Sequence, residues 1–204
     1  MPNIRPCKFT DDGHVYAETE TGVVYSSATQ IIESVGLLNY NGISKAVLEF
    51  KSTIGLAVHD TTVLYDRGEN LEEYDIDPRV ALYVSSYTLA LQTLKWKPIL
   101  VEHGPFLADV NGMTLGFKLD RVFLDAKQEI LAEIKCTSEH HPAHAIQLAI
   151  YDLCLGERKR KRVSILCRPD GKIADLKTYD DPNDYNVAIA ALAVNTWRRN
   201  HKLL

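Results

Sequence analysis

The sequence contains few cysteines, no long apolar run and no excess of basic residues. Its cysteines are far apart and include no C-x-x-C pair, so their spacing predicts neither a zinc site nor an iron–sulfur cluster and favours reduced thiols in a cytoplasmic protein. The four positions are Cys7, Cys136, Cys154 and Cys167. No apolar run reaches the roughly 18 residues that a membrane span needs, and no apolar signal core follows residues 1–5. We therefore expect a protein without a membrane segment.

Charge and composition are those of an ordinary soluble globular chain. The 23 Lys and Arg residues against 27 Asp and Glu residues leave a net charge of −4, so nucleic-acid binding would require a local basic patch. The 204 residues are 46% hydrophobic and 25% charged, which excludes a disordered or collagen-like chain. This length suits one domain around one core. We expect a single domain over 1–204, with a hairpin and helices in 1–96 and a sheet with flanking helices in 97–204.

The first 96 residues predict a β-hairpin followed by three helices. Apolar residues alternate on both sides of a glycine-containing turn, and further on they recur at helical spacing between capping residues and glycines. Ser26 or Ser27 is expected to cap the first helix, and Pro78 suits the first turn of the third. The predicted segments are strands at 14–18 and 23–25 and helices at about 27–35, 43–66 and 78–94.

The rest of the chain predicts an antiparallel unit, then a helix, two strands and a last helix. Asn111-Gly112 is the dipeptide most typical of a tight hairpin, and 169–171 predicts a further turn. Pro142 suits a helix start, and Asn183 or Asp184 is expected to cap the last helix. The predicted strands are 99–101, 106–110, 113–124, 129–136, 162–167 and 173–179, and the helices are 142–155 and 183–199. This order favours an α/β fold in which helices lie on the faces of a mixed sheet.

A candidate chemical site lies in the antiparallel unit. Asp120 is on one predicted strand, and Glu133 and Lys135 are on the next, where the period of a strand places both on one face. A short turn joins the strands, so Asp120 can lie across from Glu133. Two carboxylates suit Mg²⁺, which keeps waters for a phosphate, and a lysine can orient or deprotonate an attacking water. Spacing alone equally allows a structural salt bridge among the three side chains.

Four further residues flank this site in the sequence. His59 follows Gly55 by four positions on a predicted helix, and Glu102 precedes the hairpin. Gln147 and Tyr151 are four apart and share one face of a predicted helix. Each of them has a common structural explanation when taken alone. Their order around the acidic strands is the informative feature.

This order of motifs resembles the PD-(D/E)XK nuclease superfamily, specifically the branch of phage and RecB-like exonucleases that includes the phage lambda-type enzymes. That branch has a G-x-x-x-H helix, a glutamate before a strand that carries a glycine and an aspartate, an E-x-K strand and a Q-x-x-x-Y helix. The matching residues, within roughly 26–180, are Gly55, His59, Glu102, Gly116, Asp120, Glu133, Lys135, Gln147 and Tyr151. Residues 27–32 also look like the start of this branch. The resemblance implies a restriction-endonuclease-like α/β/α core with a mixed central sheet and extra N-terminal helices.

The resemblance also implies roles for individual residues. The catalytic carboxylates Asp120 and Glu133 would ligate Mg²⁺ or Mn²⁺, as two ions, and the Ile134 carbonyl and His59 would complete the ligand set. Lys135 would act on the attacking water. Residues that would position the DNA strand or support the catalytic lysine are Gln147 and Tyr151, whereas for Glu102 a structural role is equally open.

Two further clusters carry weaker signals. Three histidines at 140–144 could bind zinc, although no third ligand stands at a standard spacing. His144 shares a helix face with the glutamine of the Q-x-x-x-Y motif and could contact a phosphate or cap the helix. The basic run 158–162 is either a solvated turn or a patch that binds the DNA backbone through Arg158 and Arg160.

These features predict a metal-dependent deoxyribonuclease, namely an exonuclease that acts on linear DNA and leaves 5′-phosphates. The resemblance further implies phage recombination or repair in the cytoplasm of a bacterial host, a homo-oligomer, and a single-strand annealing protein as partner. Two alternatives stay open: a non-catalytic DNA-binding or assembly module of the same fold, and a sequence-specific or structure-selective endonuclease. RecB-like nucleases of the CRISPR adaptation type cluster their cysteines around an iron–sulfur centre, and this chain departs from that pattern, so no such cluster is expected.

Overall fold

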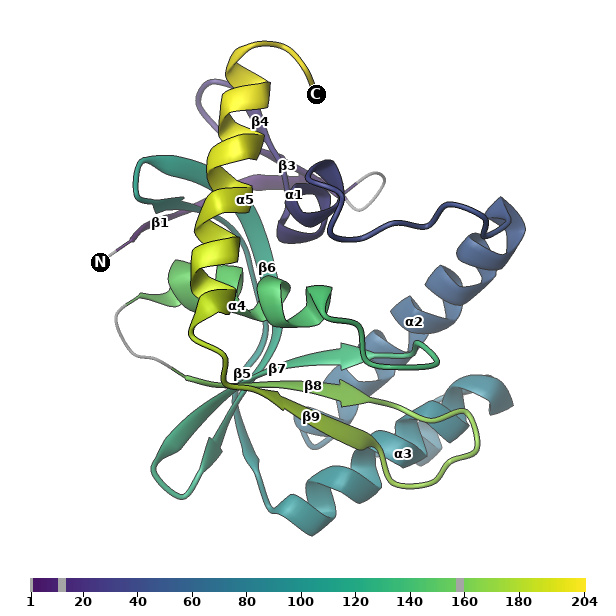
Figure 1. Ribbon diagram of the computed structural model, residues 1–204. Helices are drawn as coiled ribbons and strands as arrows, with labels where there is room; N and C mark the ends of the chain where they lie inside the picture. Colours follow the sequence, from purple (N-terminus) through teal and green to yellow (C-terminus); the bar gives the residue numbers. More distant parts are fainter. Residues whose placement is uncertain (1, 11–13, 157–159) are drawn as a thin grey trace.

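A six-stranded mixed sheet forms the centre of the computed structural model, which describes residues 2–10, 14–156 and 160–204 (Figure 1). Its strands are β1 (Asn3–Pro6), β5 (Lys97–Val110), β6 (Met113–Asp125), β7 (Gln128–Lys135), β8 (Lys161–Leu166) and β9 (Asp175–Tyr179). They lie in the order β1-β5-β6-β7-β8-β9. β7 and β8 are parallel, and the other neighbouring pairs of this sheet are antiparallel. The predicted mixed sheet is confirmed.

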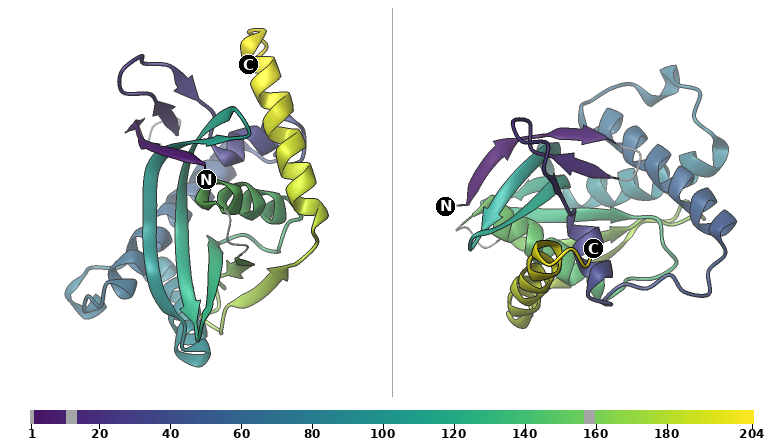
Figure 2. Two further views of the ribbon diagram at one scale, coloured as in Figure 1. Left: turned by 90° about the vertical axis from the view of Figure 1, so that its left-hand side faces the viewer. Right: turned by 90° about the horizontal axis from the view of Figure 1, so that it is seen from above.

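Helices cover both faces of this sheet (Figure 2). They are α1 (Ala28–Ser34), α2 (Lys45–Asp66), α3 (Pro78–Leu94), α4 (Ala143–Leu155) and α5 (Asn183–Asn200), with a short 3-10 helix η1 (Leu71–Glu73). One apolar core joins α1, α4 and α5 to β5 and β6. On the opposite face α3 packs against β6, β7 and β8, and α2 packs against α3. None of the described helices is both long and apolar enough to cross a membrane.

The parallel pair β7–β8 requires a crossover, and α4 provides it. Most residues of α4 are buried, because its sequence is apolar around almost its whole circumference. The helix therefore lies between the sheet and α5, and it presents Gln147 to the carboxyl-terminal part of β7. This placement brings the Q-x-x-x-Y motif against the E-x-K strand.

A second, three-stranded sheet consists of β2 (Lys8–Thr10), β3 (Val15–Ala17) and β4 (Val24–Tyr25). The predicted first hairpin is confirmed as β3–β4. The strands β1 and β2 were not predicted, because both are short and polar and show no alternation of apolar residues. Tyr16 of β3 is buried against Gly116, where an added Cβ would lie 2.1 Å from its ring. The glycine of the G…D strand thus permits this close approach.

The two predicted strands 99–101 and 106–110 are one strand, and the separation between them was wrong. β5 runs through both, but its pairing with β6 shifts register between Pro98 and Leu100 and again between His103 and Phe106. Within the second irregularity Gly104 has φ +140°, and a Cβ there would lie 2.8 Å from the Phe117 carbonyl oxygen. These irregularities break the two-residue period that sequence patterns rely on. The predicted turn at Asn111-Gly112 is confirmed, with φ +52° and +77°.

The helix starts are partly as expected. Ser27 caps α1 through a capping box with Gln30, as predicted. Ser44 caps α2, so this helix starts two residues later than predicted. The expected cap of α5 was wrong, because the Asp181 carboxylate accepts the Asn183 N–H at 2.8 Å. An acceptor two residues before the first helical residue performs the same function.

Candidate active site

Asp120 lies where β6 and β7 stop pairing through their backbones. The paired residues of the two strands run from Asp125 and Gln128 to Arg121 and Ala132. Directly beyond this point, Asp120 Oδ2 accepts the backbone N–H of Ile134 at 2.8 Å. The carboxylate therefore takes the place of a ladder hydrogen bond and lies beside the E-x-K strand, as the sequence predicted.

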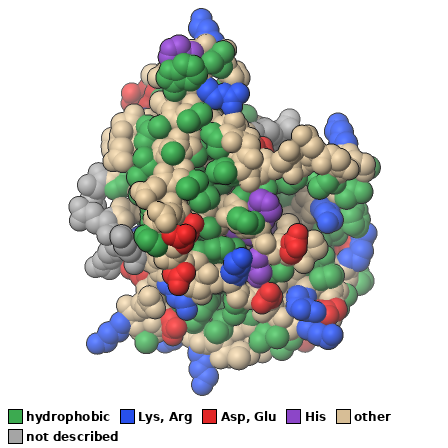
Figure 3. All heavy atoms as spheres, in the orientation of Figure 1, with side chains coloured by type: hydrophobic (Ala, Val, Ile, Leu, Met, Phe, Trp, Pro, Cys, Tyr) green, Lys and Arg blue, Asp and Glu red, His purple; other side chains and the backbone are tan. Residues whose placement is uncertain are grey.

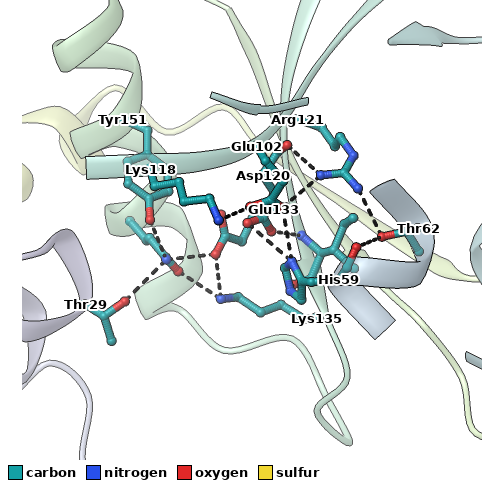
Figure 4. Close-up of polar contacts among 12 residues, drawn as sticks. Thr29, His59, Thr62, Glu102, Lys118, Asp120, Arg121, Glu133, Lys135 and Tyr151 are labelled. Atoms are coloured by element: carbon teal, nitrogen blue, oxygen red, sulfur yellow. Dashed lines mark hydrogen bonds and ion pairs between the residues drawn. The ribbon is translucent and has the colours of Figure 1, made fainter. Parts of the chain in front are cut away.

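Glu133 and Lys135 share one face of β7, which confirms the predicted geometry. Lys135 Nζ donates to Glu133 Oε1 at 2.9 Å and to Gln147 Oε1 at 3.0 Å, while Gln147 Nε2 donates to Glu133 Oε1 at 2.8 Å. The three side chains form a closed triangle (Figure 4). The second oxygen, Glu133 Oε2, is buried and has no hydrogen-bond partner among the described residues. A buried carboxylate oxygen without a partner is costly, and a cation would satisfy it.

The Q-x-x-x-Y pair of α4 lies behind this triangle. Gln147 Nε2 is 3.1 Å from the Tyr151 hydroxyl and 3.4 Å from Thr29 Oγ1 of α1. Gln147 and Tyr151 are both 7% exposed. Their contacts therefore orient Glu133 and Lys135 from within the protein, which is one of the two roles that the resemblance implies.

His59 reaches the same place from α2. Its Nε2 lies 3.2 Å from the Ile134 carbonyl oxygen, and its Nδ1 lies 3.5 Å from Asp120 Oδ1 and 3.7 Å from Glu102 Oε1. His59, Glu102 and Asp120 each offer one ligand atom, and these atoms all lie within 4.8 Å of one another. This group differs from the expected ligand set, because it contains Glu102 in place of Glu133.

Glu102 is held by cations on both oxygens. Its Oε2 accepts from Lys118 Nζ at 2.7 Å and its Oε1 accepts from Arg121 Nη1 at 3.0 Å. The residue has φ +49°, a conformation that few non-glycine residues adopt, and it lies directly before the second irregularity of β5. Since Glu102 is already satisfied and Glu133 Oε2 is not, Glu133 and Asp120 are the better candidates for carboxylate ligands.

The electrostatics of the cluster favour a cation. Burial lowers the pKa of His59, but the charge of Asp120, a hydrogen bond to Glu102 and the charges of the other carboxylates raise it overall to about 9. Burial and the charge of Asp120 raise the pKa of Glu133 to about 7. Burial lowers the pKa of Lys135, but Glu133 and Asp120 raise it overall. The negative potential that holds protons on these groups would equally hold a metal ion.

Arg121 organises this cluster from behind, and the sequence analysis missed it. The side chain is 0% exposed and donates to Thr62 Oγ1 at 3.0 Å and to the Asp120 carbonyl oxygen at 2.7 Å. It also forms ion pairs with Glu102 and with Asp66, whose carboxylate accepts from the Tyr87 hydroxyl. An arginine between apolar strand residues was the available signal, because such a residue needs buried partners.

The three histidines at 140–144 lie in different contacts. His140 Nδ1 is 2.6 Å from Ser164 Oγ, and its Nε2 is 3.3 Å from Asp175. His144 Nδ1 accepts the His141 N–H at 3.3 Å, near the start of α4. Among the described residues the histidines form no metal-ligand group of three, so nothing in the structure supports the zinc alternative. On the face shown in Figure 3, histidine, acidic and basic side chains gather near the middle.

The basic run 158–162 differs from the proposed patch. Arg158 lies outside the described residues. Arg160 Nε is 2.8 Å from Glu129 Oε2, and its Nη1 is 3.1 Å from Asp152 Oδ1, with 12% of the side chain exposed. The guanidinium of Arg160 is thus bound to two carboxylates of the protein, and its contact with DNA stays a prediction.

Comparison with known proteins does not indicate a function. No protein-family model matches the chain, and no curated protein matches it. The function must therefore be argued from the arrangement of Asp120, Glu133, Lys135 and His59.

Proposed function

We propose that the protein is a metal-dependent deoxyribonuclease with a restriction-endonuclease-like core, and that it hydrolyses phosphodiester bonds of linear DNA as an exonuclease. One observation carries the proposal: the buried oxygen Oε2 of Glu133 has no partner, although it lies in a cluster of carboxylates that shares a lysine and an imidazole. Asp66 Oδ1 also lacks a partner, but the charge of that carboxylate is offset by Arg121, whereas Glu133 lies beside a second carboxylate, Asp120, and burial together with the charge of Asp120 raises its pKa.

The donors of the site fit a hard divalent cation. Carboxylates of Asp120 and Glu133, the carbonyl of Ile134 and the imidazole of His59 are ligands that Mg²⁺ and Mn²⁺ accept. When bound, one or two such ions would polarise the phosphate and lower the pKa of the attacking water. His59 would have to lose the proton that its pKa of about 9 retains, so metal affinity should rise with pH.

The residues of the chain have distinct tasks in this proposal. Lys135 keeps its proton near neutral pH, and its ammonium, with 21% of the side chain exposed, is the group that reaches toward substrate. There it would donate to the attacking water or to a phosphate oxygen and offset negative charge. Gln147 holds both Lys135 and Glu133 and keeps them at hydrogen-bond distance. Arg121 and Lys118 offset the charge of Glu102 and fix its position.

The finer parts of the proposal rest on the resemblance of the motifs. These parts are DNA as substrate, the exonuclease mode, a homo-oligomer, a single-strand annealing partner and the cytoplasm of a bacterial host in phage recombination. The buried charge favours an enzyme over a binding module. Buried ionic clusters cost stability, and a module without chemistry would be as stable with apolar residues.

A digestion assay tests the proposal. End-labelled linear duplex and covalently closed circular DNA are incubated with the protein in Mg²⁺, Mn²⁺ or EDTA, beside Asp120→Asn and Lys135→Ala. Lys127→Ala, at the exposed β6–β7 turn, is the matched control. We expect metal-dependent loss of the linear substrate alone, abolished in the first two variants and retained in the third. Cutting of the closed circle would indicate an endonuclease, and DNA retention in EDTA without cutting would indicate a binding module.

A further inference from the structure

An apolar hollow of about 400 Å³ lies beside the site, and the proposed reaction does not use it. It is enclosed by the first half of α2, the start of α3 and the segment that follows β7, and α2 and α3 lie side by side there (Figure 1). Its volume is within the range of small-molecule sites. The residues that matter for its chemistry are Phe50, Lys51, Ile54, Arg79, Tyr83 and Cys136.

The hollow lies next to the candidate active site along both β7 and α2. Cys136 directly follows Lys135 and turns to the opposite side of the strand. Ile54 precedes His59 by five residues on the same helix, which is about 7.5 Å along its axis. Phe50 is about 6 Å further on. A strand whose phosphate lies at the cluster can therefore reach the hollow with a nearby nucleotide.

The side chains at the mouth suit a flat, uncharged ring joined to a charged backbone. Phe50 is 53% exposed, and the guanidinium of Arg79 lies over its ring at 5.4 Å. The edge of that guanidinium is bound to Asp77, so Arg79 presents its flat face. Nucleobases stack on aromatic rings and on guanidinium planes. The cation Lys51 at the rim complements a phosphate backbone.

From this geometry we infer that the hollow binds one nucleobase of the substrate strand, stacked at Phe50, next to the nucleotide whose phosphate is cut. This inference rests on the proposed function. A base in the hollow cannot remain paired, because its Watson–Crick edge turns toward protein. The enzyme would therefore act faster on single-stranded or frayed ends than on blunt duplex ends.

The test pairs an abasic substrate with a side-chain deletion. A tetrahydrofuran abasic residue is placed in turn at each of the first four nucleotides from either end of a labelled strand, and cleavage is measured with wild type and Phe50→Ala. Leu56→Ala is the matched control, because Leu56 is on the same helix and is 57% exposed but does not line the hollow. Binding is followed separately, in EDTA, by quenching of 2-aminopurine at the same positions.

An abasic residue at one position should slow cleavage by the wild-type protein about tenfold to a hundredfold, which is the range expected for the loss of one base stack. The same position should have little further effect in Phe50→Ala, and Leu56→Ala should behave as wild type. 2-Aminopurine at that position should be quenched by wild type and not by Phe50→Ala. Equal sensitivity at all positions in both proteins, while cleavage proceeds, would overturn the inference and leave the proposed function intact.

Two other outcomes are also decisive. Absence of any cleavage by wild type, with no quenching in EDTA, would overturn the proposed function and the inference together. If Phe50→Ala instead changes the oligomeric state in light scattering and leaves the abasic profile unchanged, the hollow is a contact between protein chains and the nucleobase inference is wrong.

Discussion

Replacement of Arg121 by methionine tests whether a buried network holds the proposed metal ligands in place. Arg121 lies between β5, β6 and α2, and its ion-pair partners are Glu102 and Asp66. It also binds Thr62, whose hydroxyl donates to the His59 carbonyl oxygen at 2.9 Å. Methionine keeps much of the volume but removes the charge and every donor.

The expected loss follows from what remains in the variant. The Asp66 side chain is 1% exposed, and its Oδ1 already lacks a hydrogen-bond partner among the described residues. It cannot recover hydration when the guanidinium is gone, although the Tyr87 hydroxyl at 2.7 Å remains. Removing one partner of a buried ion pair costs about 3–5 kcal/mol. That is a large part of the roughly 5–15 kcal/mol of a typical domain.

The loss should also depend on pH, with a definite sign. Burial raises the pKa of Asp66 and Arg121 opposes this rise. Without the arginine, the folded-state pKa of Asp66 rises further above its unfolded value. Such a group costs nothing while it is protonated in both states, and its cost grows as pH rises through the folded pKa. Arg121→Met should therefore be less destabilised at pH 5 than at pH 8.

Urea titration of the metal-free protein at both pH values measures the effect. Arg5→Met is the control, because Arg5 also forms two ion pairs, with Glu18 and Asp109, but is 29% exposed. Exposed pairs contribute about 1 kcal/mol or less. The proposed role of the network is refuted if Arg121→Met lowers the free energy of unfolding no more than Arg5→Met does. It is also refuted if Arg121→Met lowers that free energy equally at both pH values.

Metal binding, acid stability and the motif glycines have further measurable consequences. Mn²⁺ at about 100 times its Kd should stabilise the protein by roughly 2.7 kcal/mol in urea titrations. Asp120→Asn should lose this gain and Asp109→Asn should keep it, and equal gains would contradict the ligand assignment. Burial and then the charge of Lys135 lower the pKa of His144 to about 3. The contribution of neutral His144 to the free energy of unfolding is therefore complete above pH 6.5 and declines as pH falls. His144→Gln should therefore lose less stability than wild type between pH 7.5 and pH 4, by up to about 3 kcal/mol, and parallel pH curves would refute this. Gly116→Ala should cost about 1–3 kcal/mol because its Cβ would meet a buried ring, whereas Gly55→Ala has open space in a helix and should gain about 0.5–1 kcal/mol. Thermal unfolding compares the two, and a similar sign for both would be inconsistent with the close approach.

The regular parts of the fold could be predicted because their signals are local. Helical apolar spacing, capping serines and the Asn111-Gly112 turn each act within a few residues, and the corresponding elements formed as expected. The strands β1 and β2 pair with partners far away in the sequence and have no pattern of their own. The continuity of β5 was hidden because its register with β6 shifts between His103 and Phe106, where Gly104 lies against β6 and no two-residue alternation remains.

In the candidate site, too, contacts within one strand or helix could be predicted, and contacts between distant elements could not. The approach of Glu133 to Lys135 follows from the two-residue period of one strand, and the approach of Gln147 to Tyr151 follows from one helix turn. The support by Arg121 needs three elements to be assembled before any of its contacts exist. The ion pairs of Arg160 could not be predicted for the same reason, since its partners lie on β7 and α4.

The choice between a salt-bridge cluster and a metal site, open from spacing alone, turns on how each carboxylate is satisfied. Glu102 is neutralised by Lys118 and Arg121, and this alone would make a complete structural cluster. Placing Asp120 and Glu133 beside it adds two buried negative charges that only Lys135 and protonated His59 offset, and burial together with the charge of Asp120 raises the pKa of Glu133. Selection for stability would favour apolar residues at these positions. Their retention is intelligible if a divalent cation completes the charge, and the absence of Mn²⁺ stabilisation would refute that reading directly.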